Sequence, residues 1–164
     1  MTTIGIDPGS SGAISVLLPD RTVFVWDCPS YKIKVGGTLR RRCDQPAIID
    51  LVRYLLAVHE PDKAVIEDVG AMPGNSGMFA FGFATGMWHM AFTACGYPLQ
   101  MVTPKVWKGA LGVPTKKKTF TERDVLARAT VLLPKGEPHW PRVMDCDRAE
   151  AAMIALYASG RWGS

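Results

Sequence analysis

The chain has 164 residues, of which 48% are hydrophobic and 21% are charged, and its 19 Lys and Arg against 15 Asp and Glu give a formal net charge of +4. This length and composition exclude a disordered chain and predict one domain, residues 1–164, with its own core. No apolar run free of charges or breakers reaches the roughly 18 residues that a membrane span needs, so we expect a soluble protein without a membrane partner.

The first residues and the cysteines indicate the compartment. Met-Thr-Thr-Ile-Gly-Ile-Asp enters an apolar strand almost at once and lacks the basic and then apolar layout of a signal peptide. The four cysteines show no C-x-x-C spacing, which argues against a zinc site and fits a reducing compartment. We expect an intracellular, cytoplasmic protein in which Cys28, Cys43, Cys95 and Cys146 are small core or surface residues.

Three antiparallel strands are predicted in the first thirty residues. The stretch IGIDPGSSGAISVL, residues 4–17, contains two apolar runs joined by a Pro-Gly-Ser-Ser-Gly turn, and residues 22–27 are β-branched and aromatic. Residues 30–43 are polar and contain glycine, five cations and no acid. Their composition predicts a loop.

A helix and a central strand follow. Asp44 is placed to cap a helix with Pro46 in its first turn, and Pro61 stops it. The run KAVIE at 63–67 is nearly all apolar, as in a strand covered on both faces. The helix shows amphipathic spacing in Ile48, Leu51, Val52, Leu55 and Leu56.

The second half alternates loops, helices and one more strand. Residues 78–95 form a helix so apolar that it must be buried or pair with another chain. Three strands followed by alternating helices and strands predict an α/β domain with a mixed sheet of about five strands flanked by helices. The other expected elements are a loop at 70–77, a strand at 98–102, a short helix from Thr103-Pro104 to Ala110, a helix to Leu133 with the capping box Thr119–Glu122, a Pro-rich connection at 134–141 and a last helix at 145–159.

Acidic residues stand at three places where a charge is costly. Asp7 ends the first strand, Glu67 ends the fourth, and Asp145, Asp147 and Glu150 open the last helix. Neighbouring strand ends converge in α/β sheets, and helix positions three apart share a face. Such a cluster would repel itself unless a divalent cation bound it, and oxygen ligands suit Mg²⁺.

Each acid also has a purely structural interpretation. Asp7 before Pro-Gly can shape a turn, Glu67 followed by Asp68 can mark the exit of a strand into solvent, and Asp147 with Glu150 can cap a helix. Helix capping, however, does not require acids at the ends of two strands. The three motifs together therefore favour a metal site.

The ordered motifs resemble a known family. Ile-Gly-Ile-Asp-Pro-Gly, Val-Ile-Glu and Asp-Arg-Ala-Glu-Ala-Ala, which span residues 4–152, are similar to the signature of the RuvC-like Holliday junction resolvases, especially their bacteriophage forms, within the ribonuclease H-like superfamily. The resemblance implies a ribonuclease H-like fold, a homodimer, and nicking of two strands at a four-way DNA junction that depends on Mg²⁺ or Mn²⁺, with two ions per site and no nucleotide cofactor. A phage protein of this family would act in the cytoplasm of its bacterial host.

The resemblance also implies roles for individual residues. Asp7 matches the first catalytic aspartate, Glu67 the glutamate, and Asp147 and Glu150 the final acidic pair. Bacterial members usually carry aspartate where this chain has Glu150, whose longer side chain could alter the metal spacing. Asp145 has no assured counterpart and is kept as an additional candidate ligand.

Basic residues are the candidates for DNA contacts. Residues 101–119 contain five lysines and no acid, and a block of arginines lies within residues 30–43. A run of charge is often only a solvated surface, but a DNA-cleaving acidic site needs cations that neutralise phosphates. Trp107 could stack on a base or anchor its helix, and His59, His89 and His139 receive no role. The candidates are Lys105, Lys108, Lys116, Lys117, Lys118, Arg40, Arg41 and Arg42.

Two segments and two rival functions remain open. The loop at 70–77 could probe the centre of a junction or simply connect two elements, and the helix at 78–95 could be a core helix or a dimer interface. The opening motif also resembles the phosphate-binding turn of the sugar kinase and actin superfamily, which would make the chain a phosphotransferase. A branched-DNA-binding module without catalysis is the non-enzymatic alternative.

Overall fold

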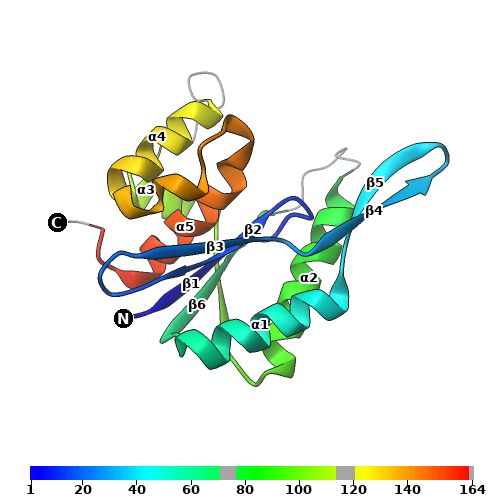
Figure 1. Ribbon diagram of the computed structural model, residues 1–164, viewed down its shortest axis with the longest axis horizontal. Helices are drawn as coiled ribbons and strands as arrows, with labels where there is room; N and C mark the ends of the chain where they lie inside the picture. The colour runs from blue at the N-terminus through cyan, green and yellow to red at the C-terminus, as the bar shows by residue number, and fades with distance from the viewer. Residues whose placement is uncertain (71–76, 114–120, 163–164) are drawn as a thin grey trace.

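A five-stranded mixed sheet forms the centre of the computed structural model, which describes residues 1–70, 77–113 and 121–162 (Figure 1). The strand order is β3-β2-β1-β6-β7, with β1 antiparallel to β2, β2 antiparallel to β3, and β6 parallel to both β1 and β7. The predicted meander and the predicted mixed sheet are confirmed. The strands are β1 Thr3–Asp7, β2 Ala13–Leu17, β3 Val23–Asp27, β6 Lys63–Glu67 and β7 Leu99–Val102.

Helices cover both faces of the sheet, so a hydrophobic core lies on each side (Figure 1). One core packs beneath α1, Gln45–His59, and α2, Met78–Ala94. The other packs beneath α5, Cys146–Ser159, together with α3, Pro104–Ala110, and α4, Glu122–Leu132. Two 3₁₀ turns, η1 Pro134–His139 and η2 Val143–Asp145, connect α4 to α5. No helix in these described segments is long and apolar enough to cross a membrane.

Helix α1 forms as its sequence predicts. The Asp44 side chain accepts a hydrogen bond from the Ala47 amide at 3.2 Å, and Pro46 lies in the first turn. Ile48, Val52 and Leu55 are buried against the sheet. The helix ends one residue before Glu60, which adopts a left-handed conformation with φ 43°.

The prediction of a loop at residues 30–43 is wrong. These residues form a hairpin of β4, Ser30–Val35, and β5, Thr38–Cys43, which makes a separate two-stranded sheet projecting from the domain (Figure 1). Gly36 and Gly37 have φ of 55° and 83°, the conformation that a tight two-residue hairpin turn requires. The charged composition hid a glycine pair flanked by two alternating strands.

The N-terminus of α4 lies two residues later than predicted. Thr121 is its N-cap, and the Asp124 carboxylate accepts hydrogen bonds from the Thr121 amide at 2.8 Å and hydroxyl at 2.7 Å. The sequence Thr-Phe-Thr-Glu at 119–122 matches the capping-box pattern, but the next threonine in the chain has the more compact aspartate partner. At α5, Asp145 belongs to the 3₁₀ turn and the helix begins at Cys146.

Helix α2 is buried on only one side. Ala84, Trp88, Ala91 and Phe92 are inaccessible, and no Asp, Glu, Lys or Arg occurs between residues 78 and 94. The opposite side exposes an apolar stripe with helical spacing, in which a Cβ added at Gly86 would have no atom within 4 Å. This exposed stripe consists of Phe79, Phe83, Gly86 and Met90.

Two cysteines meet although 15 positions separate them. The sulfur atoms of Cys28, after β3, and Cys43, at the end of β5, lie 3.9 Å apart, and both side chains are buried. Both are free thiols. The contact joins the base of the hairpin to the central sheet, and the spacing of the cysteines in the sequence did not predict it.

Helix α5 lies directly on the backbone of β1. The Thr3 hydroxyl donates to the Ala155 carbonyl at 2.8 Å, and the Ser15 hydroxyl donates to the Ala151 carbonyl at 2.8 Å. Between them, a Cβ on Gly5 would overlap the Ala151 carbonyl oxygen and the Ala155 amide nitrogen. Only glycine permits this close approach.

Candidate active site

Strands β1 and β6 bring two carboxylates to one edge of the sheet. Side chains alternate along a strand, so Asp7 lies on the same face as Thr3 and Gly5, the face that α5 covers. The parallel register pairs Ile6 with Ile66, which makes Asp7 and Glu67 the next neighbours at the two strand ends. Both are buried, with Asp7 9% and Glu67 6% exposed.

Helix α5 adds the other two carboxylates from above. Asp147 and Glu150 are half-buried in its first turns. Burial raises the pKa of Asp7 well above its ordinary value, and the negative charges of Asp147, Glu150 and Glu67 raise it further. The structure therefore brings together the four acids that the sequence singled out, with Asp7 at the centre of their mutual repulsion.

Glu67 is held by a neighbour that the sequence did not identify. The indole N–H of Trp107, in α3, donates to Glu67 Oε1 at 2.8 Å. Burial raises the pKa of Glu67, and this hydrogen bond opposes that rise. Trp107 is completely buried, so it anchors α3 and orients the carboxylate, and base stacking is excluded. An indole N–H five residues after a strand carries no sequence signal of this role.

Asp147 also has an unexpected partner. Burial raises the pKa of Asp147, while a hydrogen bond from Ser11, in the turn between β1 and β2, lowers it. The Pro-Gly-Ser-Ser-Gly turn thus contributes a hydroxyl to the carboxylate on the opposite helix. The turn was predicted, but the direction of its serine was not.

Lys108 is the lysine that enters the acidic cluster. Its ammonium lies 2.8 Å from Glu150 Oε1, with the two side chains 19% and 16% exposed, and 5.0 Å from the Trp107 ring centroid. Burial lowers the pKa of Lys108, but the charge and hydrogen bond of Glu150 outweigh burial and raise it. Lys105 is exposed on the same helix, whereas Lys116, Lys117 and Lys118 fall outside the described residues.

Asp145, kept as an additional candidate ligand, is paired with Arg142. Arg142 donates to its carboxylate through Nε at 3.0 Å and through Nη2 at 2.7 Å, and the Arg142 amide adds a third contact at 3.0 Å. These hydrogen bonds lower the pKa of Asp145, which is only 4% exposed. Its oxygens stabilise the turn that begins α5.

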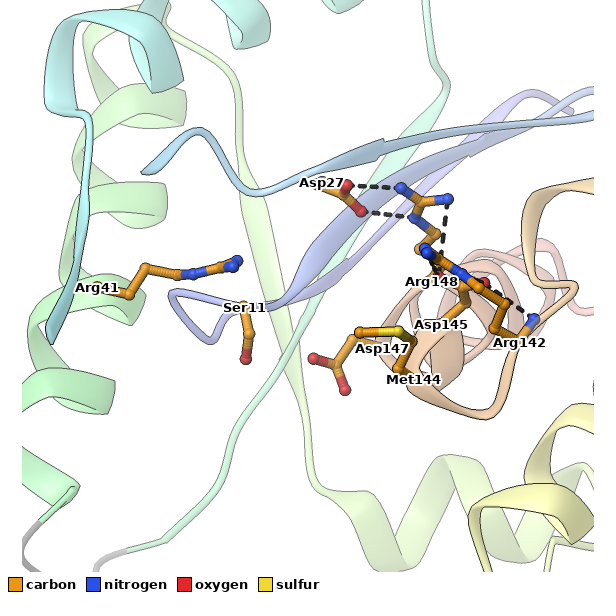
Figure 2. A pocket seen from close by; sticks show the side chains of 8 residues that line it. All are labelled: Ser11, Asp27, Arg41, Arg142, Met144, Asp145, Asp147 and Arg148. Carbon is orange, nitrogen blue, oxygen red and sulfur yellow. Dashed lines mark hydrogen bonds and ion pairs between the residues drawn. The ribbon is translucent and has the colours of Figure 1, made fainter. Parts of the chain in front are cut away.

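A pocket of about 220 Å³ opens beside Asp147. Within it, Arg148 donates to both oxygens of Asp27 at 2.6 Å each. Figure 2 shows Arg41 reaching from the hairpin toward Ser11 and Asp147, on the opposite side of the pocket from these ion pairs. The lining residues are Ser11, Asp27, Arg41, Arg142, Met144, Asp145, Asp147 and Arg148.

The donor set fits a hard divalent cation. Asp7 sits among three other acids whose combined charge raises its pKa, and a bound cation would remove that repulsion. Among residues 1–70, 77–113 and 121–162, no three acid, His or Cys side chains are already arranged to enclose an ion. Glu67 accepts a hydrogen bond from Trp107, and Glu150 is paired with Lys108.

Comparison with known proteins identifies the relatives of this chain. No family model matches. The crossover junction endodeoxyribonuclease RuvC of Nitratidesulfovibrio vulgaris (strain Hildenborough) is 34% identical over 114 residues, which cover 68% of this chain and 66% of that relative, just under two thirds of its length.

Solved structures share the fold. Thermus thermophilus RuvC has a TM-score of 0.60 at 20% identity, covering 97% of this chain and 93% of that one. The same protein in complex with a Holliday junction substrate has a TM-score of 0.65 at 19% identity, covering 99% of this chain and 96% of that one. The yeast mitochondrial Holliday junction resolvase has a TM-score of 0.54 at 16% identity, covering 98% of this chain and 78% of that one.

The sequence relative and the solved structures thus share the RuvC name and the architecture of this chain. Asp7 and Glu67 at adjacent strand ends and the acidic pair on the last helix occupy one site. The chain is therefore RuvC-like in sequence over these 114 residues and has the fold of the solved RuvC structures, a ribonuclease H-like fold.

Proposed function

We propose that this protein is a metal-dependent endodeoxyribonuclease that recognises four-way or related branched DNA and hydrolyses phosphodiesters to give paired nicks. The observation that carries the proposal is the convergence of Asp7, Glu67, Asp147 and Glu150 around one buried point of a RuvC-like fold. The relative named a crossover junction endodeoxyribonuclease supports the reaction, and the solved complex of Thermus thermophilus RuvC with a Holliday junction supports the substrate.

Asp7, Glu67, Asp147 and Glu150 would hold Mg²⁺ or Mn²⁺. When bound, two such ions would neutralise the carboxylates, activate water and stabilise the leaving oxygen of the phosphodiester. The protein supplies an acidic, largely buried site in which the strand ends fix Asp7 and Glu67 rigidly. Helix α5 positions the remaining two ligands over them.

Three neutral or basic side chains position these acids. Trp107 orients Glu67, Ser11 lowers the pKa of Asp147, and Lys108 balances the charge of Glu150. Lys108 is also the cation best placed to meet a phosphate that approaches the carboxylates, because it is still 19% exposed. Partners of this kind fix ligand orientation and tune ligand basicity.

Further DNA contacts come from surrounding cations. Lys105 is exposed beside Lys108 on α3, and Arg41 extends from the hairpin into the pocket beside Asp147. Lys116 to Lys118 remain candidate phosphate contacts on the basis of their sequence alone. Such contacts give affinity that does not depend on base sequence and falls with salt.

The exposed stripe of α2 is the proposed dimer interface. Phe79 is 78% exposed, Met90 60% and Phe83 36%, and Gly86 between them leaves room for another helix to approach. A two-fold dimer would present two acidic sites to two strands of a junction, which paired nicks require.

The test compares the wild type with Asp7→Asn on labelled four-way junctions, on linear duplex and on ATP, each with and without Mg²⁺. Metal-dependent nicking of the junction that disappears in Asp7→Asn is the expected result. Junction binding without cleavage at any metal or pH would instead identify a binding module, and ATP consumption without DNA cleavage would identify a phosphotransferase.

A further inference from the structure

The register of the β4–β5 hairpin sorts its cations onto two faces. Residues directly opposite each other in an antiparallel pair share a face, and successive residues alternate between faces. The pairs Lys32–Arg41 and Lys34–Leu39 therefore lie on one face, which we call the pocket face. The opposite face carries Tyr31–Arg42 and Ile33–Arg40.

Arg41 shows that the pocket face begins at the active site. Arg41 lines the pocket that also contains Ser11 and Asp147, and Figure 2 shows its side chain directed toward them. Lys32 lies directly across from Arg41, and Lys34 follows two positions further along β4. The pocket face thus forms a row of three cations that starts beside the carboxylates and runs outward along the arm seen in Figure 1.

The charges of this row are only partly balanced by the protein, because Asp27, an acid that attracts Arg41 electrostatically, is already paired with Arg148. The other two arginines of the pocket are committed, Arg148 to Asp27 and Arg142 to Asp145. Within the described parts of the chain, Arg41, Lys32 and Lys34 form no hydrogen bond or ion pair, and residues 30–43 contain no acid. Like charges directly across two strands repel, so the Lys32–Arg41 pair favours an anion between them.

The spacing suits a polymer of phosphates. Residues on one face of a strand recur about every 6.7 Å, and a DNA strand carries one phosphate for about every 3.4 Å of helix axis. A single small anion could occupy the position at Arg41 but not the whole row. The buried contact between the Cys28 and Cys43 sulfur atoms packs the base of the arm against the central sheet.

We propose that the pocket face of the hairpin is a phosphate track, in which Arg41, Lys32 and Lys34 guide a DNA strand between the active site and the tip of the arm. This proposal rests on the proposed function, because it assigns the path of that same substrate. Arg40 and Arg42, on the opposite face, lie off the track.

The experiment compares two charge-matched double variants, Lys32→Gln with Arg41→Gln on the pocket face and Arg40→Gln with Arg42→Gln on the opposite face. Binding of a labelled four-way junction is measured without divalent metal across a series of KCl concentrations. Each lost phosphate contact lowers the slope of log K against log salt by about 0.9. We expect the pocket-face variant to lose about 1.8 in slope and at least about tenfold in affinity at low salt, and the control to lose less than half as much slope.

Equal losses in the two variants, or a larger loss on the opposite face, would overturn the track. Binding needs no catalysis, so a wild type that binds junctions but never cuts them would overturn the nuclease and leave the track standing. A wild type that cuts while the two variants bind alike would overturn the track alone, and a wild type that does not bind DNA would overturn both. Thermal melting of both variants checks that the substitutions in the hairpin leave the fold intact.

Discussion

Trp107 donates its indole N–H to Glu67 Oε1 at 2.8 Å, so a wholly buried helix residue sets the orientation of a carboxylate at the end of a strand. We expect Trp107→Phe, which keeps the aromatic bulk and removes the donor, to lower metal affinity or cleavage about 10- to 100-fold, as is typical for partners of metal ligands. Mg²⁺ titrations of cleavage rate measure this. Activity within about twofold of the wild type would show that packing alone orients Glu67.

Lys108 controls the charge of the acidic cluster. In Lys108→Met, the positive charge next to Glu150 is lost, so the pKa of Glu67, which this charge lowers, rises and cleavage needs a higher pH. We expect the acid limb of the pH profile of kcat/KM to shift to higher pH. Lys105→Met, an exposed lysine on the same helix, is the control and should weaken binding without moving the profile. An unmoved acid limb in Lys108→Met would mean that Lys108 acts only on the DNA.

Asp7 should destabilise the metal-free protein at neutral pH. Its pKa is raised in the folded state, so the folded protein holds this proton more tightly than the unfolded chain, and stability falls as pH rises from the unfolded value toward the folded one. Asp7→Asn removes this loss. We expect a higher melting temperature for metal-free Asp7→Asn at pH 7, by about 2–4 °C for each kcal/mol regained.

The same variant should no longer gain stability from Mg²⁺, because a ligand that binds only the folded state stabilises it by mass action. Differential scanning calorimetry with and without Mg²⁺ measures both effects. Asp50→Asn, at an exposed position of α1, is the control and should respond to Mg²⁺ like the wild type. A lower melting temperature for metal-free Asp7→Asn would contradict the assigned repulsion.

The exposed stripe of α2 should decide the oligomeric state. Phe79→Glu places a charge on this stripe without touching a core residue, since Phe79 is 78% exposed. We expect the wild type to scatter light as a dimer and Phe79→Glu as a monomer of 17.9 kDa. Val131→Glu, at a 71% exposed apolar position of α4, is the matched control and should remain dimeric. A monomeric wild type at micromolar concentration would refute the interface.

The Cys28–Cys43 pair should form a disulfide under mild oxidation. The hydrogen bond between the thiols lowers the pKa of Cys43 and raises that of Cys28, so Cys43 is the more acidic thiol and the one that attacks first. With hydrogen peroxide, the two thiols would give one disulfide and two waters. Peptide mapping under non-reducing conditions should find this cross-link and no Cys95–Cys146 link. If both thiols stay reduced under these conditions, the prediction is wrong.

Most of the sheet and the helices could be predicted because their signals are local. The alternation of β1 and β2, the cap at Asp44 and the apolar run of β6 each depend on residues close together in the chain. The hairpin at 30–43 escaped because its five cations and its exposed side chains resemble a solvated loop. The signals that mark it are the alternation of Tyr31, Ile33 and Val35 with lysines and the Gly36-Gly37 turn.

The acidic residues of the site could also be singled out, since a charge at the end of a buried strand is costly wherever it occurs. Their partners could not be. Trp107 meets Glu67 from 40 positions away, and Ser11 meets Asp147 from the far end of the chain. Asp145 shared the acidic pattern of its neighbours but faces Arg142, and only the turn geometry separates these two outcomes.

Gly5 gives the acidic site its width. Asp7 and the pair Asp147 and Glu150 face each other across the seam between β1 and α5, and that seam is as narrow as two backbones allow because residue 5 has no side chain. A single methyl group at this position would lift the helix from the strand and draw the two halves of the site apart. The absence of a Cβ at Gly5, two residues before Asp7, thus sets the distance between the carboxylates of β1 and those of α5.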